Sequence, residues 1–263
     1  MIHIGGTLTG KALKQKLRTT QDLRVWRIDP KGEMPNTFGA LCGVVVCAPQ
    51  EALKQLAEEV PQNNEAVCSM AEEMDRLSED YRPQTPAETL MAQIAFSLKQ
   101  IDSSLITLHL ANSTTVRAIA PFIDGGSRRI LCNRGVNGIE GSVSVAAGYS
   151  LAAEGLSLLV TGDLSFFYDQ NALWTEELDG RLRIVVMNDG HGGIFDRLPG
   201  LSASPASSCF IAGSHHATAE GTAETFGLTY KRTNCHNTAL ANNLAWLLTV
   251  ESPRPVVLEV KMT

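Results

Sequence analysis

Short runs of apolar residues, separated by helical patterns, constrain the fold of this chain more than any other feature. Two of these runs read "LSLLVTG" and "RIVVMN", at residues 156–162 and 183–188. Strands that are apolar on both faces are typical of a sheet covered by helices on both sides, and such sheets are mostly parallel. We therefore predict an α/β fold with a doubly wound parallel sheet.

The first part of the chain alternates strands and helices but is small. Strands are predicted near Ile2–Ile4, Leu23–Ile28 and Val44–Cys47, and helices near Thr9–Arg18, Gln50–Glu59 and Asn64–Leu77. The polar segment "SEDYRPQTPAET" (78–89), which contains two prolines, then predicts a domain boundary. We expect a partial central domain over residues 1–82 and a larger domain over residues 83–263.

The second part repeats the alternation over a longer stretch. Strands are predicted near Leu105–Leu110, Arg129–Cys132, Leu156–Thr161, Arg183–Met187 and Val256–Val260. Helices are predicted near Gly141–Ala153, Phe166–Glu177 and Asn237–Leu248. Because connections between parallel strands are long and usually helical, this pattern suits one continuous parallel sheet.

Charge and cysteine content exclude several classes of function. The chain has 22 Lys and Arg against 28 Asp and Glu, a net charge of −6, and no dense basic run, which argues against nucleic acid as a partner. Its six cysteines form no C-x-x-C pair and lie mostly in apolar strings, so we expect buried, reduced thiols. We find no signal peptide and no apolar run that would span a bilayer, and predict a cytoplasmic protein.

Polar clusters follow two of the apolar strands. Gly162-Asp163 ends one strand and Asn188-Asp189-Gly190 ends the next, 25 residues later if counted from Asp163 to Asn188. That interval has the length of one helix and one strand, which brings both clusters to the carboxyl edge of the sheet, where ligands bind in such folds. A carboxylate, an amide oxygen and a backbone carbonyl suit Mg²⁺, whose remaining ligands are usually phosphates and water.

A lone Gly-Asp after a strand is more often a turn with an N-cap than a metal site. The second cluster at this spacing favours a Mg²⁺-diphosphate site instead. Gly162 allows close approach of the backbone, and Ser165 with the helix behind it offers N–H groups to a phosphate.

At these motifs the chain resembles thiamine-diphosphate enzymes, in particular the 2-succinyl-5-enolpyruvyl-6-hydroxy-3-cyclohexene-1-carboxylate synthases of menaquinone biosynthesis. The segments that carry the resemblance are "LANSTTVR" (110–117), "NRGVNGIEGSVSVAAGY" (133–149), "GDLSFFYDQNAL" (162–173) and "GGIFDRLPG" (192–200). The resemblance implies a thiamine-dependent decarboxylation of 2-oxoglutarate, followed by addition of the succinyl unit to isochorismate.

The resemblance also implies roles for individual residues. Mg²⁺, or Mn²⁺ in its place, would be held by Asp163, Asn188 and the carbonyl of Gly190. Arg117 and Arg134 would bind substrate carboxylates, as guanidinium groups suit dicarboxylates in a net-negative protein. Ile139 would support the thiazolium ring, and Phe195 would line the pocket. The cofactor-binding positions would be Asn112, Ser113, Ile139, Gly162, Asp163, Leu164, Ser165, Asn188, Gly190 and Ile194.

Two assignments stay open. The family usually has Asn-Asn where this chain has Asn188-Asp189, so either residue could be the second metal ligand. Lys11, in "GGTLTGKALKQKLR" (5–18), matches a lysine that could reach the second substrate, but a solvated helix lysine is an equal alternative.

The resemblance further assigns the activating glutamate to a separate pyrimidine-binding domain. Glu33, Glu51 and Glu65 have no family motif around them, so we expect this chain to lack that domain, to be inactive alone and to form a homodimer or homotetramer.

Other interpretations are weaker. A nucleotide-binding module would need G-x-G-x-x-G after an early strand, and "GHGGIF" lacks the last glycine. A zinc hydrolase would use His215, His216, Cys235 and His236, which we interpret as residues of solvated loops because no metal-binding spacing joins them. His191, inside the glycine loop, is the histidine best placed to line the pocket. A non-catalytic diphosphate-binding or interaction fragment, or another 2-oxo-acid decarboxylase, remains an alternative.

Overall fold

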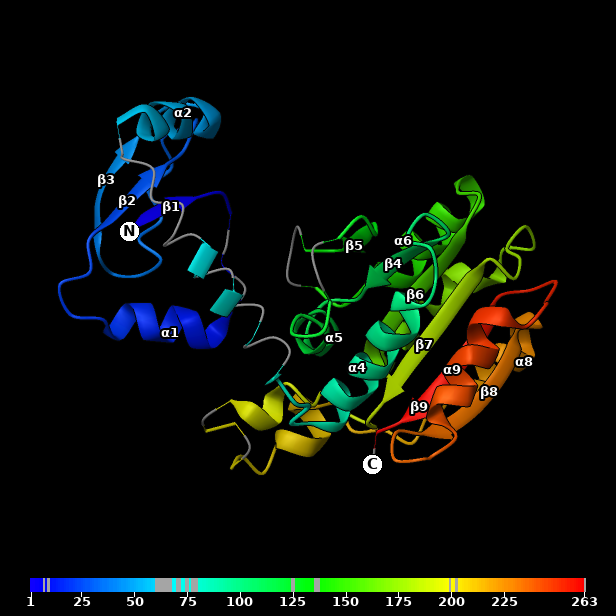
Figure 1. Ribbon diagram of the computed structural model, residues 1–263. Helices are drawn as coiled ribbons and strands as arrows, with labels where there is room; N and C mark the ends of the chain where they lie inside the picture. Colours follow the sequence, from blue (N-terminus) through cyan, green and yellow to red (C-terminus); the bar gives the residue numbers. More distant parts are fainter. Residues whose placement is uncertain are drawn as a thin grey trace. The chain divides into compact units, whose positions relative to one another are not determined.

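The computed structural model describes residues 1–6, 8, 10–59, 68–69, 72–73, 76, 80–123, 126–134, 138–198, 200–201 and 203–262. The chain divides into two compact units, Met1–Asp80 and Tyr81–Thr263 (Figure 1). Among the described helices, none combines the length and the hydrophobicity that a bilayer crossing requires.

The first unit contains a small parallel sheet with strand order β1-β2-β3. Its elements are β1 (Ile2–Ile4), α1 (Lys11–Thr19), β2 (Val25–Ile28), β3 (Leu41–Val45) and α2 (Pro49–Glu59). The three predicted strands and the helices over α1 and α2 are confirmed, although β3 begins three residues before the predicted Val44. The helix predicted at Asn64–Leu77 lies largely outside the described residues.

The second unit is built on six parallel strands in the order β5-β4-β6-β7-β9-β8. They are β4 (Ile106–Leu110), β5 (Ile130–Cys132), β6 (Leu156–Gly162), β7 (Leu182–Asn188), β8 (Thr229–Asn234) and β9 (Val256–Lys261). The α-helices are α4 (Pro86–Lys99), α5 (Thr114–Ile119), α6 (Ser142–Ala152), α7 (Asp163–Asp169), α8 (Glu220–Phe226) and α9 (Leu240–Thr249). Shorter helical turns are η1 (Gln170–Trp174), η2 (Phe195–Arg197) and η3 (Ser207–Ile211).

Helices cover both faces of this sheet, so the predicted doubly wound α/β fold is confirmed (Figure 1). Buried side chains of α4, α5 and α9 pack on one face, against strand residues such as Leu108, Val185 and Leu258. Buried side chains of α6, α7 and α8 pack on the other face, against Leu159, Ile184 and Val257. Alternate residues of each strand thus enter different cores, which explains why the central strands are apolar throughout.

The strand order contains a switch point between β4 and β6. The chain leaves β4 through α5, which packs in the first core, whereas it leaves β6 through α7, which packs in the second. The two connections therefore diverge to opposite faces and leave space beyond the carboxyl ends of β4 and β6. Such a position is where ligands bind in open α/β sheets.

Several predictions from sequence need correction. Helix α4 begins inside the polar segment 78–89, because Thr85 accepts a hydrogen bond from the N–H of Glu88 (3.2 Å) and the Glu88 carboxylate accepts one from the N–H of Gln84. Thr85 therefore caps a helix that starts at Pro86, inside the segment where the domain boundary was predicted, and the two units divide in the same segment, after Asp80. Strand β8 and helices α5 and α8 were not predicted, and the helix predicted at Phe166–Glu177 is α7 followed by η1.

The cysteines are free, as predicted, but not uniformly buried. Cys235 is buried, whereas Cys42, Cys68 and Cys209 are exposed. The apolar residues around the cysteines therefore did not predict which of the thiols are buried.

Candidate functional site

Asp163 lies at the carboxyl edge of the sheet, directly after β6. The register of β6 with β7 pairs Gly162 with Met187, so Asp163 lies next to the end of β7. Its side chain is buried, and its carboxylate accepts the N–H of Leu164 (2.6 Å) on Oδ1 and the N–H of Gly190 (2.8 Å) on Oδ2. The two polar clusters of the sequence are therefore in direct contact, as their spacing predicted.

Asn188, the last residue of β7, is buried and its amide has a defined orientation. Its Nδ2 donates to the carbonyl of Ala217 (3.0 Å) and to Oε1 of Glu259 (2.5 Å). Its Oδ1 accepts from the N–H of Gly190 at 3.0 Å. Because both partners of Nδ2 are acceptors and the partner of Oδ1 is a donor, the reversed amide would face mismatched groups on both sides.

Gly190 is the point on which these oxygens converge. Its N–H lies within hydrogen-bond distance of both Asp163 Oδ2 and Asn188 Oδ1. Its φ of +78° favours glycine, and a Cβ here would lie 3.2 Å from the carbonyl oxygen of His215. The Gly190 carbonyl accepts the N–H of His215 (2.8 Å), which leaves one lone pair for a further partner.

Asp189 is close enough to Asp163 for the two carboxylates to interact. Burial, followed by repulsion from Asp163, raises the pKa of Asp189 to about 6. His191 lies beyond it, with Nε2 at 2.7 Å from Asp196 Oδ2 and Nδ1 at 3.1 Å from the Asp189 carbonyl oxygen. The hydrogen bond to Asp196 raises the pKa of His191. The glycine loop therefore carries excess negative charge beside Asp163.

Asn112 and Ser113 follow β4 on the other side of the switch point. The Asn112 amide donates to the carbonyl of Gly138 (2.9 Å), and its Oδ1 accepts from Arg134 Nη1 (2.8 Å). Ser113 has φ 73° and ψ −124°, a conformation unusual for a residue with a side chain. Such strain is concentrated at functional positions, which supports the prediction for this pair.

Ile139 is held between two of the predicted positions. Its carbonyl accepts a hydrogen bond from the hydroxyl of Ser165, and the preceding carbonyl, that of Gly138, binds Asn112. The segment that the resemblance assigns to the thiazolium ring is thus tied to both β4 and α7.

The remaining predicted residues are less constrained. Arg117 is exposed at the end of α5, and Ile194 is exposed beside η2. Phe195 packs against the loop, since a Cβ on Gly192 would lie 3.0 Å from its ring. Lys11 is the first residue of α1, and its side chain is outside the described part. Whether Arg117 and Arg134 share one cavity stays a prediction.

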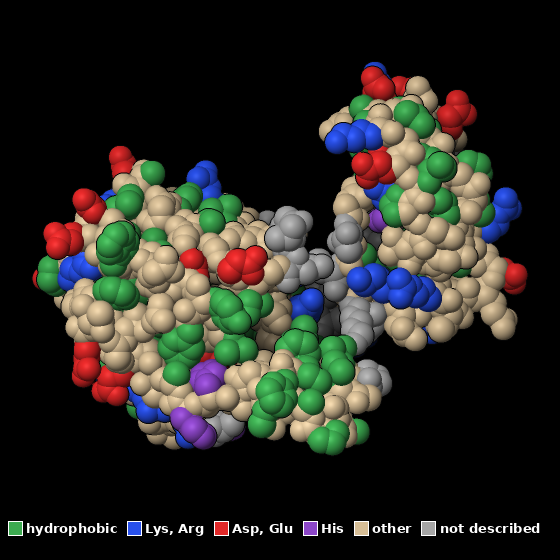
Figure 2. All heavy atoms as spheres, turned by 180° about the vertical axis from the view of Figure 1, so that it is seen from behind, with side chains coloured by type: hydrophobic (Ala, Val, Ile, Leu, Met, Phe, Trp, Pro, Cys, Tyr) green, Lys and Arg blue, Asp and Glu red, His purple; other side chains and the backbone are tan. Residues whose placement is uncertain are grey.

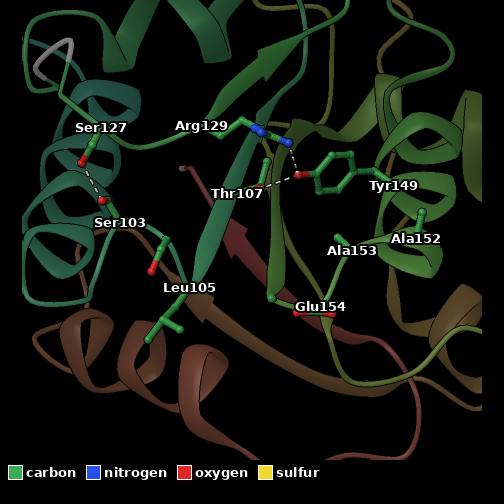
Figure 3. A pocket seen from close by; sticks show the side chains of 11 residues that line it. Ser103, Leu105, Thr107, Ser127, Arg129, Tyr149, Ala152, Ala153 and Glu154 are labelled. Carbon is green, nitrogen blue, oxygen red and sulfur yellow. Dashed lines mark hydrogen bonds between the residues drawn. The ribbon is translucent and has the colours of Figure 1, made fainter.

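A cavity of about 520 Å³ lies at the opposite edge of the sheet (Figure 3). It is formed where β4 and β6 begin, and Thr107, Arg129 and Tyr149 line it. The Tyr149 hydroxyl accepts from Arg129 Nη1 (3.1 Å) and shares a hydrogen bond with Thr107 (3.0 Å). None of the predicted site residues lines this cavity, so its size does not identify the functional edge.

The donor set beside Gly190 fits a hard divalent cation. Asp163 Oδ2 and Asn188 Oδ1 lie close enough together to accept from the same N–H, that of Gly190, and each has a further lone pair for a cation, as has the Gly190 carbonyl. His215 Nε2 is buried and 3.2 Å from Asp163 Oδ2, yet it makes no hydrogen bond with described residues. No cluster of three His, Cys, Asp or Glu suited to a metal occurs in the described ranges, so a cation here would depend on amide, carbonyl and non-protein oxygens.

Sequence reasoning missed three residues of this edge. Glu259 and Tyr230 come from β9 and β8, and the Tyr230 hydroxyl donates to Glu259 (2.5 Å). His215, interpreted from sequence as solvated, is instead mostly buried against Asp163, with its ring 5.4 Å from that of Phe167. Cys235 is also buried rather than in a solvated loop. The apolar neighbours of Glu259 in "VVLEV" were the one available signal in the sequence. They predict a buried carboxylate, and carboxylates are rarely buried without a partner.

Fold and edge together define the class: an α/β protein with the doubly wound architecture of the thiamine-diphosphate-binding fold. No family model matches the chain. Curated relatives do, and three share the name 2-succinyl-5-enolpyruvyl-6-hydroxy-3-cyclohexene-1-carboxylate synthase. The relative from Bacteroides fragilis is 37% identical over 88% of this chain, that from Bacteroides thetaiotaomicron 34% over 99%, and that from Flavobacterium johnsoniae 30% over 99%.

The chain is thus a relative of these synthases, and the resemblance predicted from its motifs is confirmed. The matches cover 41%, 46% and 47% of the three relatives, so the chain spans less than half of their length.

The raised pKa of Asp189 predicts how the stability of the metal-free chain depends on pH. The folded state holds this proton up to about pH 6, whereas the unfolded state releases it near the ordinary value of 3.8. The folded state therefore binds more protons between these values, and stability falls as pH rises through this window. Thermal unfolding in EDTA should show that Asp189→Asn raises the melting temperature at pH 7 but not at pH 4. An equal effect at both pH values would contradict the raised pKa of Asp189.

Proposed function

We propose that this chain is the C-terminal part of a thiamine-diphosphate- and Mg²⁺-dependent synthase of menaquinone biosynthesis. The reaction is decarboxylation of 2-oxoglutarate and transfer of the succinyl unit to isochorismate. The observation that supports this most strongly is the convergence of Asp163 and Asn188 on Gly190, at the sheet edge where the motifs of the synthases predict a metal. Residues 83–263 are then the diphosphate-binding domain, and residues 1–82 part of a central domain.

In this proposal Asp163, Asn188 and the Gly190 carbonyl bind Mg²⁺, or Mn²⁺ in its place. Thiamine diphosphate, when bound, supplies the electron sink for decarboxylation, while the protein supplies position and electrostatics. Asn112, Ser113, Gly162, Leu164 and Ser165 surround the cofactor. Ile139 supports it from below, fixed by the bonds that its own and the preceding carbonyl accept.

Arginines account for the substrates, which are both dicarboxylates. Arg134 already approaches the cofactor side of the site through its hydrogen bond to Asn112. Arg117, exposed on α5, has its guanidinium available for a carboxylate. Because the chain carries a net charge of −6, such local cations are needed to attract anionic substrates. Ile194 and Phe195 would line the apolar side of the same pocket.

A second candidate function is a non-catalytic diphosphate-binding or interaction fragment. The Asp163 and Asn188 oxygens beside Gly190 would suffice for diphosphate binding without catalysis. Another 2-oxo-acid decarboxylase of the same class is the alternative within the catalytic proposal.

We expect the chain to bind pyrophosphate or thiamine diphosphate only with Mg²⁺ or Mn²⁺, because Asp163 and Asn188 reach the diphosphate through the metal. Calorimetry with Mg²⁺ should show binding that EDTA removes and that Asp163→Ala and Asn188→Ala abolish. Asp179→Ala is the matched control, because Asp179 is paired with Arg181 at the opposite edge (2.9 Å). Heats that persist in EDTA would refute the site. Loss of binding in Asp189→Ala but not in Asn188→Ala would move the second ligand to Asp189.

The chain should self-associate, because large hydrophobic side chains are exposed on neighbouring elements of the second unit. Val145 and Leu151 on α6, Tyr168 on α7 and Trp174 on η1 are exposed by 46%, 45%, 71% and 73%. Figure 2 shows hydrophobic side chains gathered on one face of this unit. Exposed apolar area of this kind usually finds a partner, here a second copy or a pyrimidine-binding domain. Sedimentation at tens of micromolar tests this, and a single monomeric species would contradict it.

Turnover distinguishes the two candidate functions. With 2-oxoglutarate, isochorismate, thiamine diphosphate and Mg²⁺, the chain alone should give no product, because no glutamate in the sequence matches the activating residue. General acid–base groups of this kind are usually worth about 10² to 10⁴ in rate. An N-terminal domain, supplied by coexpression or as an extended chain, should restore activity.

The controls decide between the alternatives. Asp163→Ala should abolish the restored activity, and Asp179→Ala should retain it. Turnover by the chain alone would refute the expectation that the glutamate is supplied from elsewhere. Activity with pyruvate but not with 2-oxoglutarate would indicate a different thiamine enzyme, and persistent inactivity would favour the non-catalytic fragment.

A further inference from the structure

Glu259 is a fully buried carboxylate beneath the candidate metal site. It lies in the middle of β9, with a register opposite Val186 of β7 and Arg232 of β8, and it is 0% exposed. Buried carboxylates are rare and unfavourable unless each oxygen is hydrogen-bonded or paired with a cation. Its β9 neighbours Leu258 and Val260 are apolar and buried, and Arg232, its neighbour in β8, is exposed, so the buried carboxylate needs an explanation.

The donors around Glu259 are all neutral. Oε1 accepts from Asn188 Nδ2 at 2.5 Å, whereas Oε2 accepts from the N–H of Ala219 (3.1 Å) and the hydroxyl of Tyr230 (2.5 Å). The two bonds on Oε2 fix the carboxylate, and Oε1 is left to bind the amide of Asn188. Short bonds to a charged acceptor are stronger than neutral ones and define geometry more tightly.

The consequence for Asn188 is a fixed amide. Glu259 and the Ala217 carbonyl are both acceptors, so they hold the NH₂ group on their side. Oδ1 must then face Gly190 and the Asp163 carboxylate. A carboxylate that accepts from the NH₂ group also increases the electron density on Oδ1, in the way that outer carboxylates raise the basicity of metal ligands.

We propose that Glu259 is the positioning residue of the metal site: it orients and polarises the Asn188 amide so that Oδ1 is presented to the divalent cation. The inference rests on the proposed function and deepens it by assigning a residue outside all the sequence motifs. It also selects Asn188 over Asp189 as the second ligand, because only the amide of Asn188 is held in this way.

The same geometry predicts that position 188 requires an amide. In Asn188→Asp, one carboxylate oxygen would face Glu259 Oε1 and the Ala217 carbonyl, so three oxygens would meet without a donor. Replacing Glu259 by glutamine in the same chain supplies an NH₂ group at position 259, which can donate to the carboxylate at position 188. Asn188→Asp should therefore fail alone and recover together with Glu259→Gln.

The experiment measures Mn²⁺ affinity in the presence of pyrophosphate, by electron paramagnetic resonance on the full chain. Glu259→Gln should weaken Mn²⁺ binding at least tenfold, the usual lower limit for loss of an outer partner of a metal ligand. Glu154→Gln is the matched control, since Glu154 lines the cavity at the opposite edge and should leave the affinity unchanged. Asn188→Asp should abolish binding, and the double variant should regain at least tenfold over it.

A second readout separates positioning from a general loss of structure and needs no metal. With ¹⁵N-labelled asparagine, the side-chain NH₂ signal of Asn188, identified by its absence in Asn188→Ala, should be shifted downfield and exchange slowly with solvent. Glu259→Gln should move this signal and speed its exchange, whereas Glu154→Gln should not.

The outcomes distinguish the two proposals. If the wild-type chain binds no Mn²⁺ with pyrophosphate, the proposed metal site fails, and the NH₂ signal alone then shows whether Glu259 holds Asn188. If the wild type binds but Glu259→Gln binds equally, with an unchanged NH₂ signal, the inference about Glu259 is wrong and the proposed function stands. Loss of binding in Glu259→Gln without recovery in the double variant would also overturn it, because it indicates a structural role only.

Discussion

The candidate site depends on the register of three adjacent parallel strands, β6, β7 and β9. Gly162 pairs with Met187 and Asn188 pairs with Lys261, so the ends of these strands are level. Asp163 and Asn188 meet only because of this alignment. A slip of one residue in β7 would turn Asn188 to the opposite face and exchange the side chains that fill the two cores, so the packing of both cores fixes the position of the polar groups.

The parts of the fold that were predictable are those in which local pattern and burial agree. The central strands are apolar on both faces because helices cover both faces, and that pattern is visible in the sequence. Asp163 and Asn188 were predictable because one helix and one strand return the chain to the same edge. Strand β8, "TYKRTN", was not, because it is an edge strand with polar side chains and carries no apolar run. Helix α4 was missed because the residues that cap it, around Thr85 and Pro86, are polar and proline-rich like those of a loop.

The parts of the site that were not predictable come from long-range strand order. Glu259 is 71 residues from Asn188 in sequence, and the contact exists because β9 inserts between β7 and β8. His215 reaches Asp163 from a loop whose path no periodicity describes. Neither residue belongs to a motif, so the sequence did not indicate which residues they would contact. The proposed metal ligands follow local rules, whereas the residue proposed to orient one of them follows strand order.

The number of carboxylates at this edge of the sheet is an argument for a bound cation, and no single hydrogen bond makes that argument by itself. Asp163 and Asp189 lie side by side, Glu259 lies beneath Asn188, and the groups that these carboxylates contact are mostly neutral N–H and O–H donors. Burial, followed by repulsion from Asp163, raises the pKa of Asp189 to about 6, so that its carboxyl group keeps a proton instead of adding a further charge. Folding alone would favour fewer charges here, and an apolar residue would fill the place of Glu259 at lower cost. Local conflicts of this kind persist where function requires them, and a divalent cation coordinated by Asp163 and Asn188 would resolve the conflict directly.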